Sequence, residues 1–335
     1  MSSNFFRTFA RENCLLKVLT DILQMERIII DAHSHLWLRQ DTTWNGQAIH
    51  TTRNGRSLFL GEEVQMLPPF MIDGRNTAEI FLSNMDYAQV HAAVLVQEFI
   101  DGLQNDYLQM VQFSYPERFF ACGMANYLGD NFFEQARNLM DRGYRGMAIP
   151  GHRLLGKPLT DPDMMRMFHL MEERGVLLSI TLADGDEQVG QLREVIQECP
   201  QLKVAIGHLG MAAPPQQNPW ENPSWQAQIL LARNEHVMIE SGGITWLYNA
   251  EFYPFPTAVR AIREAAALVG MEKLMWGSDY PRTITAITYK MSYDFVVKSA
   301  ELTEEEKRLF LGENARRFYG FGELPELPYV KNMSE

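Results

Sequence analysis

Eight short runs of apolar and β-branched residues, separated by longer stretches of helical periodicity, constrain the fold of this chain most. The runs are 27–32, 91–96, 119–124, 144–149, 176–181, 202–206, 237–240 and 274–276. Their nearly continuous hydrophobicity is typical of strands that are buried on both faces, as in a parallel sheet. Helices are expected between them, over 131–142, 161–174, 188–198, 223–233 and 257–268. Eight strands that alternate with helices predict an α/β chain folded as a (β/α)8 TIM barrel.

A doubly wound open sheet is the structural alternative to a barrel. No GxGxxG or GxxxxGK[ST] motif follows the first run, so the main positive argument for a nucleotide-binding open sheet is missing. We expect an N-terminal helical extension over 1–25, a barrel over 26–325 and a C-terminal tail over 326–335. The stretch from His35 to about Asn76 is long for a loop after the first strand, and in a barrel such an insertion would cover the catalytic face as a lid.

Composition and charge exclude several classes of protein. The 335 residues are 46% hydrophobic and 21% charged, which is ordinary for a soluble globular chain. The net charge of −12 argues against nucleic-acid binding, and no apolar stretch reaches the roughly 18 residues of a membrane span. Cys14, Cys122 and Cys199 are widely spaced and form no CxxC pair. We therefore expect a cytoplasmic protein with neither a disulfide scaffold nor a thiolate zinc site.

A pair of histidines directly follows the first apolar run. Side chains two residues apart on a strand point to the same side, so His33 and His35 can converge on one point, as metal ligation requires. Two surface histidines in a loop are the alternative, and the position of the segment 31–35 directly after the apolar residues 28–30 makes that alternative less favourable.

Two further residues with useful chemistry follow the ends of predicted strands. His208 comes after the sixth run and suits a general acid or base, although a structural histidine is the alternative. Asp279 follows the eighth run and can bind a metal, accept a proton from water, or simply cap the next helix. Because barrel enzymes place catalysis at the C-terminal ends of their strands, we expect these two residues and the histidine pair to share one pocket.

Three segments resemble the amidohydrolase superfamily, and specifically its amidohydrolase-2 branch: 31–35 (DAHSH), 207–210 (GHLG) and 276–281 (WGSDYP). The stretch 311–320 (LGENARRFYG) is similar to the closing helix of that branch, so that the resemblance runs from about 27 to 322. The branch contains lactone hydrolases and metal-dependent decarboxylases. The resemblance therefore implies a barrel enzyme and leaves its reaction open between these two classes.

The resemblance also implies a role for individual residues. His33 and His35 match the metal-binding pair of strand one, and Asp279 matches the strand-eight aspartate that binds metal or acts as the base on the attacking water. His208 matches the strand-six histidine that polarises substrate or transfers a proton. Where the family usually has a metal-binding histidine on strand five, this chain has Thr181. We therefore expect one divalent metal, zinc or manganese, which is weakly bound or absent.

Two carboxylates follow Thr181 closely enough to be considered as substitutes for the missing histidine. They are Asp184 and Asp186, although the alignment does not require either of them.

Basic residues after three strands indicate an anionic substrate. Arg39, Arg153 and Arg282 follow strands one, four and eight, and guanidinium groups pair with carboxylates. His152 can add a hydrogen bond. For each of these residues a structural contact is the alternative.

The function expected from the sequence is hydrolysis of a carboxylated lactone or sugar-acid lactone. Asp279 would be the general base on a water held by His33 and His35, with or without a single metal, and His208 would stabilise the oxyanion. A metal-dependent decarboxylase of a small aromatic or unsaturated acid is the alternative, and an inactive barrel used for binding is less favoured. The expected partner is a small anionic substrate, and a homodimer is also expected.

Overall fold

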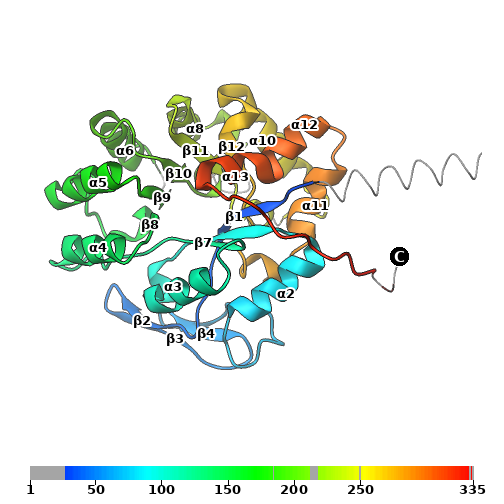
Figure 1. The fold of residues 1–335 in the computed structure, drawn as a ribbon, viewed down its shortest axis with the longest axis horizontal. Coiled ribbons are helices and arrows are strands. Elements are labelled where there is room, and N and C mark those ends of the chain that lie inside the picture. Colours follow the sequence, from blue (N-terminus) through cyan, green and yellow to red (C-terminus); the bar gives the residue numbers. More distant parts are fainter. Residues whose placement is uncertain (1–26, 184, 212–217, 249, 332, 334–335) are drawn as a thin grey trace, which may run out of the picture.

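The computed structural model describes residues 27–183, 185–211, 218–248, 250–331 and 333. The predicted helical extension over 1–25 lies outside these described residues. The described chain has an α/β fold, in which helices surround a group of central strands (Figure 1).

The eight predicted strands are confirmed, and they pair in parallel. One sheet has the order β1 (Ile30–Ser34), β6 (Ala92–Leu95) and β7 (Phe119–Ala121). The other sheet contains, in chain order, β8 (Gly146–Pro150), β9 (Leu177–Thr181), β10 (Val204–Ile206), β11 (Val237–Glu240) and β12 (Leu274–Met275).

Backbone hydrogen bonds link the two parallel sheets at both edges. At one edge Ala32 donates its amide to the carbonyl of Trp276 at 2.9 Å. At the other edge Ala148 donates to the carbonyl of Gly123 at 2.8 Å, next to a parallel bridge between Gly123 and Met147. The parallel strands therefore have backbone contacts from the first strand to the last.

Helices follow the strands and cover their outer side (Figure 1). The longer ones are α2 (Ala78–Ala88), α3 (Asn105–Ser114), α4 (Phe132–Asp141), α5 (Pro162–Arg174), α6 (Glu187–Glu198), α8 (Pro223–Leu230), α10 (Pro256–Val269) and α11 (Met291–Lys298). Shorter helices are η1 (Phe99–Asp101), η2 (Gly151–Arg153), α7 (His208–Met211), η3 (Pro219–Glu221), η4 (Leu231–Arg233), α9 (Ile244–Leu247), η5 (Met271–Lys273), η6 (Thr283–Thr285), α12 (Glu304–Arg308), the π-helix η7 (Leu309–Glu313) and α13 (Asn314–Tyr319).

Local signals explain why the predicted helix over 161–174 is found almost unchanged as α5. The Asp161 side chain accepts a hydrogen bond from the amide of Asp163 at 3.0 Å, and Pro162 occupies the first turn, where its missing N–H costs nothing. The helix ends at Gly175, whose φ of 64° suits glycine.

Alternate side chains of the strands belong to two different hydrophobic clusters. Ile30 and Val94 lie in the inner cluster, which Phe318 and Tyr319 of α13 also join. Leu95, which is adjacent to Val94, belongs to the outer cluster, which includes most of the buried helix faces. The inner space is therefore filled by side chains, and polar residues are found where the strands end.

The insertion after β1 forms a sheet of its own. Its four antiparallel strands are β2 (Asp41–Trp44), β3 (Gln47–Thr51), β4 (Arg56–Phe59) and β5 (Glu62–Gln65), paired in chain order. Trp44 donates its indole N–H to the backbone carbonyl of Arg153, just after β8, at 3.0 Å. This contact holds the inserted sheet against the C-terminal ends of the parallel strands.

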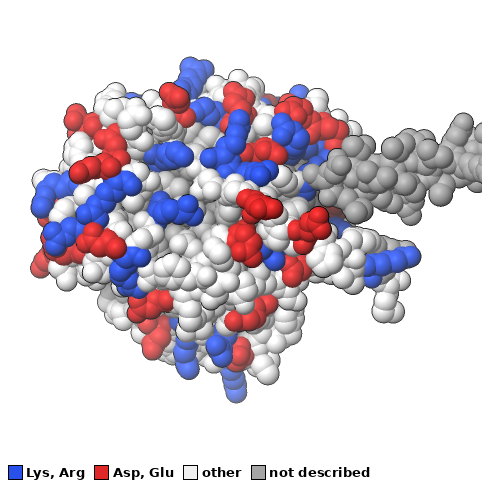
Figure 2. All heavy atoms as spheres, viewed as in Figure 1, with Lys and Arg blue, Asp and Glu red and all other residues white. Residues whose placement is uncertain are grey.

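Basic and acidic side chains are interspersed over the face shown in Figure 2. None of the described helices is both long and apolar enough to cross a membrane.

Close packing between η7 and the segment just before β1 predicts a site that cannot accept a side chain. A Cβ atom at Gly312 would lie 2.1 Å from the backbone oxygen of Ile28. We expect Gly312→Ala to lower the free energy of unfolding by about 1–3 kcal/mol, because the helix must move away from the strand.

Urea unfolding of the variant and the parent protein measures this change. Gly190→Ala on α6 is the matched control, because a Cβ atom at that position meets nothing within 4 Å and alanine favours a helix by about 1 kcal/mol. Equal urea midpoints for the Gly312 variant and the parent protein would contradict the packing described here.

Candidate active site

A cavity of about 440 Å³ opens where the parallel strands end. His33, His35, His208 and Asp279 line it together, as the sequence predicted, and Phe59 from the inserted sheet forms part of its wall. The inserted sheet therefore contributes directly to the cavity.

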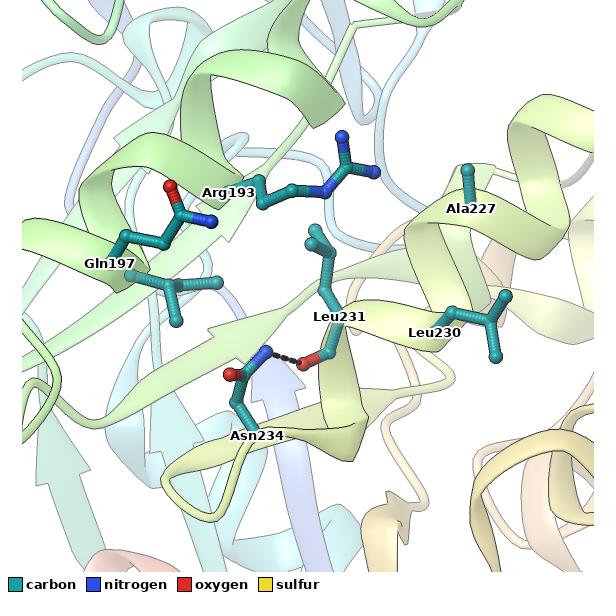
Figure 3. A pocket seen from close by; sticks show the side chains of 7 residues that line it. Arg193, Gln197, Ala227, Leu230, Leu231 and Asn234 are labelled. Carbon is teal, nitrogen blue, oxygen red and sulfur yellow. Dashed lines mark hydrogen bonds between the residues drawn. The ribbon is translucent and has the colours of Figure 1, made fainter.

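A second hollow of about 350 Å³ lies between α6 and α8 (Figure 3). Arg193 is the charged residue among those that line it, and Ile196, Ala227 and Leu230 are apolar. This hollow lacks the acid–base groups that the first cavity brings together.

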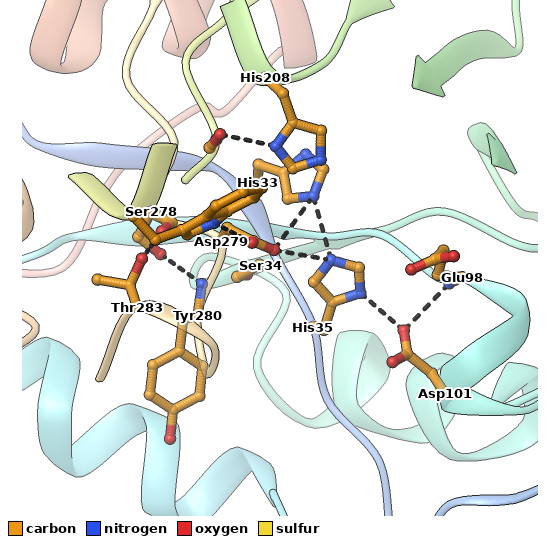
Figure 4. Close-up of polar contacts among 12 residues, drawn as sticks. His33, Ser34, His35, Glu98, Asp101, His208, Ser278, Asp279, Tyr280 and Thr283 are labelled. Carbon is orange, nitrogen blue, oxygen red and sulfur yellow. Dashed lines mark hydrogen bonds and ion pairs between the residues drawn. The ribbon is translucent and has the colours of Figure 1, made fainter. Parts of the chain in front are cut away.

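Three side chains converge at the first cavity (Figure 4). The Nε2 atoms of His33 and His35 lie 3.1 Å apart. The Oδ1 atom of Asp279 lies 3.3 Å from Nε2 of His35 and 3.8 Å from Nε2 of His33. All three side chains are less than a tenth exposed, so that water competes little with their mutual interactions.

Two buried carboxylates determine which nitrogen atoms face the cavity. Nδ1 of His33 donates to Oε1 of Glu240 at 2.7 Å, and Nδ1 of His35 donates to Oδ2 of Asp101 at 2.7 Å. With both Nδ1 atoms protonated, the two Nε2 lone pairs point toward one another and toward Asp279. A cation or a proton must lie between them, and such carboxylate–histidine pairs are typical partners of metal ligands.

The three ligands fit one divalent cation. Their ligand atoms all lie within 4.8 Å of one another. Metal–ligand bonds of about 2.0–2.1 Å in a tetrahedron separate the ligand atoms by about 3.3 Å, close to the distances found here. His33, His35 and Asp279 can therefore hold a single metal ion with little rearrangement.

The local charges shift the pKa values of the site in opposite directions. Burial would lower the pKa of His35, but the Asp101 carboxylate outweighs burial and raises the pKa to about 10. Burial would raise the pKa of Asp279, yet the hydrogen bond from His35 and the charges of the histidines hold it well below its ordinary value. Asp279 is therefore ionised at every working pH.

His208 is neutral, unlike His35. Burial, together with the charge of His33, lowers the pKa of His208 to about 4, so that its imidazole is neutral. Its Nδ1 atom donates to the carbonyl of Gly242 at 2.7 Å. The Nε2 atom of His208 is then an acceptor, and the ring can take up a proton but has none to offer at Nε2.

Two of these residues adopt an unusual backbone conformation. Both His208 and Asp279 have a φ of 57°, in the left-handed region that costs non-glycine residues about 1 kcal/mol or more. The Asp279 amide donates to the carbonyl of His33 at 2.9 Å, which fixes the loop after β12 against β1.

The buried carboxylate of Asp31 holds the same loop. It accepts hydrogen bonds from the amide of Ser278 at 2.8 Å and from the hydroxyl of Tyr289 at 2.8 Å. Burial raises the pKa of Asp31 to about 6, against the effect of these hydrogen bonds. Asp31 thus positions the residue next to Asp279.

The predicted substrate-binding residues separate into two groups. His152, Arg153 and Arg282 line the cavity, whereas Arg39 is exposed and lies outside the residues that line it. Burial and the neighbouring Arg282 lower the pKa of Arg153 to about 10. Glu98, which the sequence analysis did not single out, pairs with both Arg153 and His152.

The position of the missing strand-five histidine carries a hydroxyl group. Thr181 ends β9, is buried and lines the cavity. Asp186 is exposed at the start of α6 and does not line the cavity, and Asp184 lies outside the described residues.

Sequence reasoning missed Asp101 and Glu240, the partners of the two histidines. Glu240 ends an otherwise apolar predicted strand, so a charged residue at the end of a buried strand was an available signal. Asp101 belongs to η1, five residues beyond the predicted strand 91–96, and its sequence context carries no comparable signal.

Residues 30–321 match the family model described as Amidohydrolase (Amidohydro_2). The chain therefore belongs to the amidohydrolase family, and it is an enzyme of the amidohydrolase superfamily. This finding confirms the resemblance drawn from the strand-end motifs. A search of curated proteins finds no match.

Solved structures share the fold at low sequence identity. A probable 2-pyrone-4,6-dicarboxylic acid hydrolase from Acinetobacter baumannii, with citric acid bound, has a TM-score of 0.65 and 22% identity, and the match covers 88% of this chain and 99% of that one. An amidohydrolase from Burkholderia multivorans with bound zinc has a TM-score of 0.65 and 17% identity, over 89% and 100% of the two chains. A 5-carboxyvanillate decarboxylase from Novosphingobium aromaticivorans, complexed with manganese, has a TM-score of 0.54 and 17% identity, over 72% and 80%.

The contact between Glu240 and His33 predicts the effect of removing one charge. We expect Glu240→Gln to weaken zinc binding by about 10- to 100-fold, because the amide cannot accept all the hydrogen bonds that the carboxylate accepts from His33, His208 and Gly242. Isothermal titration with zinc measures the affinity.

Glu194→Gln is the matched control for this variant, because Glu194 is exposed on α6. Unchanged zinc affinity in Glu240→Gln would show that Glu240 does not orient a ligand.

The raised pKa of His35 predicts how zinc affinity depends on pH. Because this pKa is about 10, the metal-free protein carries a proton on His35 between pH 6 and 8, and zinc must displace that proton. The apparent affinity should therefore rise with pH, by about tenfold per pH unit for each proton displaced.

Titrations in buffers of different ionisation enthalpy count the released protons. We expect at least one proton per zinc ion, and fewer in Asp101→Asn, which lacks the charge that raises the pKa of His35. An affinity that is independent of pH over this range would contradict the prediction.

Proposed function

We propose that this protein hydrolyses a small lactone that carries carboxylate groups, such as a pyrone dicarboxylate or a sugar-acid lactone. The observation that carries the proposal is the convergence of His33, His35 and Asp279 in one cavity that Arg153 and Arg282 also line. An acid–base centre beside two guanidinium groups suits an anionic ester more than a neutral one.

We infer that the eight parallel strands close into a (β/α)8 barrel. The hydrogen bonds that join β1 to the segment after β12, and the segment after β7 to β8, support closure. A barrel places the C-terminal ends of all its strands around one opening, which accounts for the meeting of residues from β1 and from beyond β10 and β12.

One divalent cation, zinc or manganese, would be held by His33, His35 and Asp279. Bound there, such a cation would polarise a carbonyl group and make a bound water more acidic. Thr181 stands where a further histidine ligand is usual, so we expect the ion to be held by these three residues and by exchangeable ligands.

Asp279 would accept the proton of the attacking water. Trp246 donates its indole N–H to Oδ2 of Asp279 at 2.6 Å, which orients the carboxylate and leaves Oδ1 beside the histidines. The lowered pKa of Asp279 keeps the group ionised and ready to accept a proton, although it makes the carboxylate a weak base.

His208 would relay a proton within the site. Opening of a lactone by water moves one proton from the water to the alkoxide or enolate oxygen that leaves. The neutral His208 has an acceptor at Nε2, so it can receive this proton from Asp279 and pass it to the leaving oxygen, which restores both residues to their starting states. Of the two roles that the sequence suggested for His208, this proposal keeps proton transfer and gives up stabilisation of the oxyanion.

The guanidinium groups would bind the carboxylates of the substrate. Arg282 stacks over the ring of Trp246, with 3.6 Å between its Cζ atom and the ring centroid, and so stands close to the residue that orients Asp279. Burial and the neighbouring Arg282 lower the pKa of Arg153 although Glu98 pairs with it, and a bound carboxylate would add negative charge between the two guanidinium groups.

Decarboxylation of a small aromatic or unsaturated acid is the second candidate reaction. The structural similarity to a decarboxylase complexed with manganese supports it, and the same three ligands would serve it. The missing strand-five histidine favours hydrolysis, because a lactone is reactive enough to be opened at a less strongly bound cation.

The purified protein should open 2-pyrone-4,6-dicarboxylate or a sugar-acid lactone without releasing CO₂. Incubation with a panel of these lactones and of aromatic carboxylic acids, with ring opening and CO₂ both measured, tests the proposal. We expect Asp279→Asn to lower kcat by about 10²–10⁴-fold, as removal of a general base does.

Asp186→Asn is the matched control, because Asp186 is exposed and does not line the cavity. Release of CO₂ from an aromatic acid, with no lactone opened, would replace hydrolysis with decarboxylation. Full lactonase activity in Asp279→Asn would remove Asp279 as the base.

A further inference from the structure

A second group of side chains that could bind a metal lies between α5 and the end of α6, outside the cavity. His169 and Glu172 belong to α5, and Cys199 follows the last residue of α6. Their ligand atoms all lie within 4.8 Å of one another. The sequence led us to expect no thiolate zinc site because it lacks a CxxC pair, but the fold brings a single cysteine against two other ligand types.

Local structure holds these side chains together. His169 and Glu172 are three residues apart on a helix, so they lie on the same face, one turn from each other. The Glu172 Oε1 atom accepts a hydrogen bond from the amide of Gln201 at 2.6 Å, which fixes the carboxylate beside the end of α6. The amide of Cys199 donates to the carbonyl of Val195 at 2.8 Å, which fixes the position of the cysteine.

The distance between sulfur and nitrogen matches tetrahedral coordination. Sγ of Cys199 lies 3.4 Å from Nδ1 of His169. A zinc ion with a Zn–S bond of about 2.3 Å and a Zn–N bond of about 2.0–2.1 Å would separate the two ligand atoms by about 3.5 Å. The same distance also suits a hydrogen bond from thiol to imidazole, and the experiment below separates the two cases.

The surroundings favour a cation. The negative charges of Glu172 and Glu198 act on the Cys199 side chain, and a bound cation would balance them. A divalent cation that binds here takes the place of the thiol proton. His169 is exposed, so that an ion can enter the site from solvent.

We propose that His169, Glu172 and Cys199 bind one zinc-class divalent cation, separate from the centre formed by His33, His35 and Asp279. Thiolate, imidazole and carboxylate together form a ligand set that suits zinc. The ion would connect α5 to the end of α6 through three protein ligands, with water in the remaining position.

Titration of the full-length protein with Co²⁺ tests this proposal, because a thiolate bound to cobalt gives a charge-transfer band in the near ultraviolet. The three ligands in the cavity are nitrogen and oxygen atoms, so they give no such band. The parent protein for the titration carries Cys14→Ser, which removes a cysteine outside the described residues, and Cys122 is buried in the core.

We expect the band to saturate at one equivalent of Co²⁺ at this site and to be absent in Cys199→Ser. His169→Gln and Glu172→Gln should each weaken the binding by about tenfold or more, as the loss of one ligand does. Glu198→Gln is the matched control: it removes an exposed charge next to Cys199 but no ligand, and we expect a change of less than about threefold.

Three results would overturn the proposal: no band in the parent protein at excess Co²⁺, a band that persists in Cys199→Ser, or a band that His169→Gln and Glu172→Gln leave unchanged. The first would show a thiol–imidazole hydrogen bond only, and the last would show cysteine binding cobalt by itself. Thermal melting without metal checks that each variant is folded. If Cys199→Ser is not folded, the titrations of His169→Gln and Glu172→Gln test the proposal, because both residues are more exposed than Cys199.

Discussion

The facing Nε2 atoms of His33 and His35, 3.1 Å apart, are the interaction on which the rest of the site depends. Glu240 and Asp101 accept hydrogen bonds from the opposite nitrogen atoms and so hold both lone pairs toward the cavity. Such an arrangement is unfavourable unless a proton or a cation lies between the rings. Asp101 and Asp279 raise the pKa of His35 and so keep a proton between the rings, and the ionised Asp279 balances the charge of that proton.

This arrangement requires the ends of distant strands to be held in register. The loop after β12 is fixed to β1 by the hydrogen bond from the Asp279 amide to His33 and by the contacts of Ser278 with Asp31. Asp279 takes a left-handed backbone conformation in this loop, a strain that the surrounding hydrogen bonds sustain. The buried Asp31 carboxylate is therefore a structural requirement of the site, although it does not line the cavity.

The inserted sheet packs against the charged part of the cavity. Arg153 lies over the rings of Trp44 and Phe59, at 5.1 and 5.7 Å from their centroids. The sequence predicted the insertion but not its strands, although Asn45–Gly46 and Asn54–Gly55, dipeptides typical of hairpin turns, were signals for two of its turns. Glu98, which pairs with Arg153, had no such signal, because the pairing joins residues from separate loops.

Local patterns in the sequence determined the eight strands and the main helices, because strands that are buried on both faces leave continuous apolar runs. They also determined the four candidate site residues, because barrel enzymes place catalytic residues at the C-terminal ends of such strands. Tertiary structure alone decided which carboxylates hold His33 and His35, that Arg39 lies outside the cavity, and that Cys199 meets His169. These contacts join residues that are far apart in the chain. Local periodicity cannot predict them, because the packing of helices and loops decides which distant residues meet.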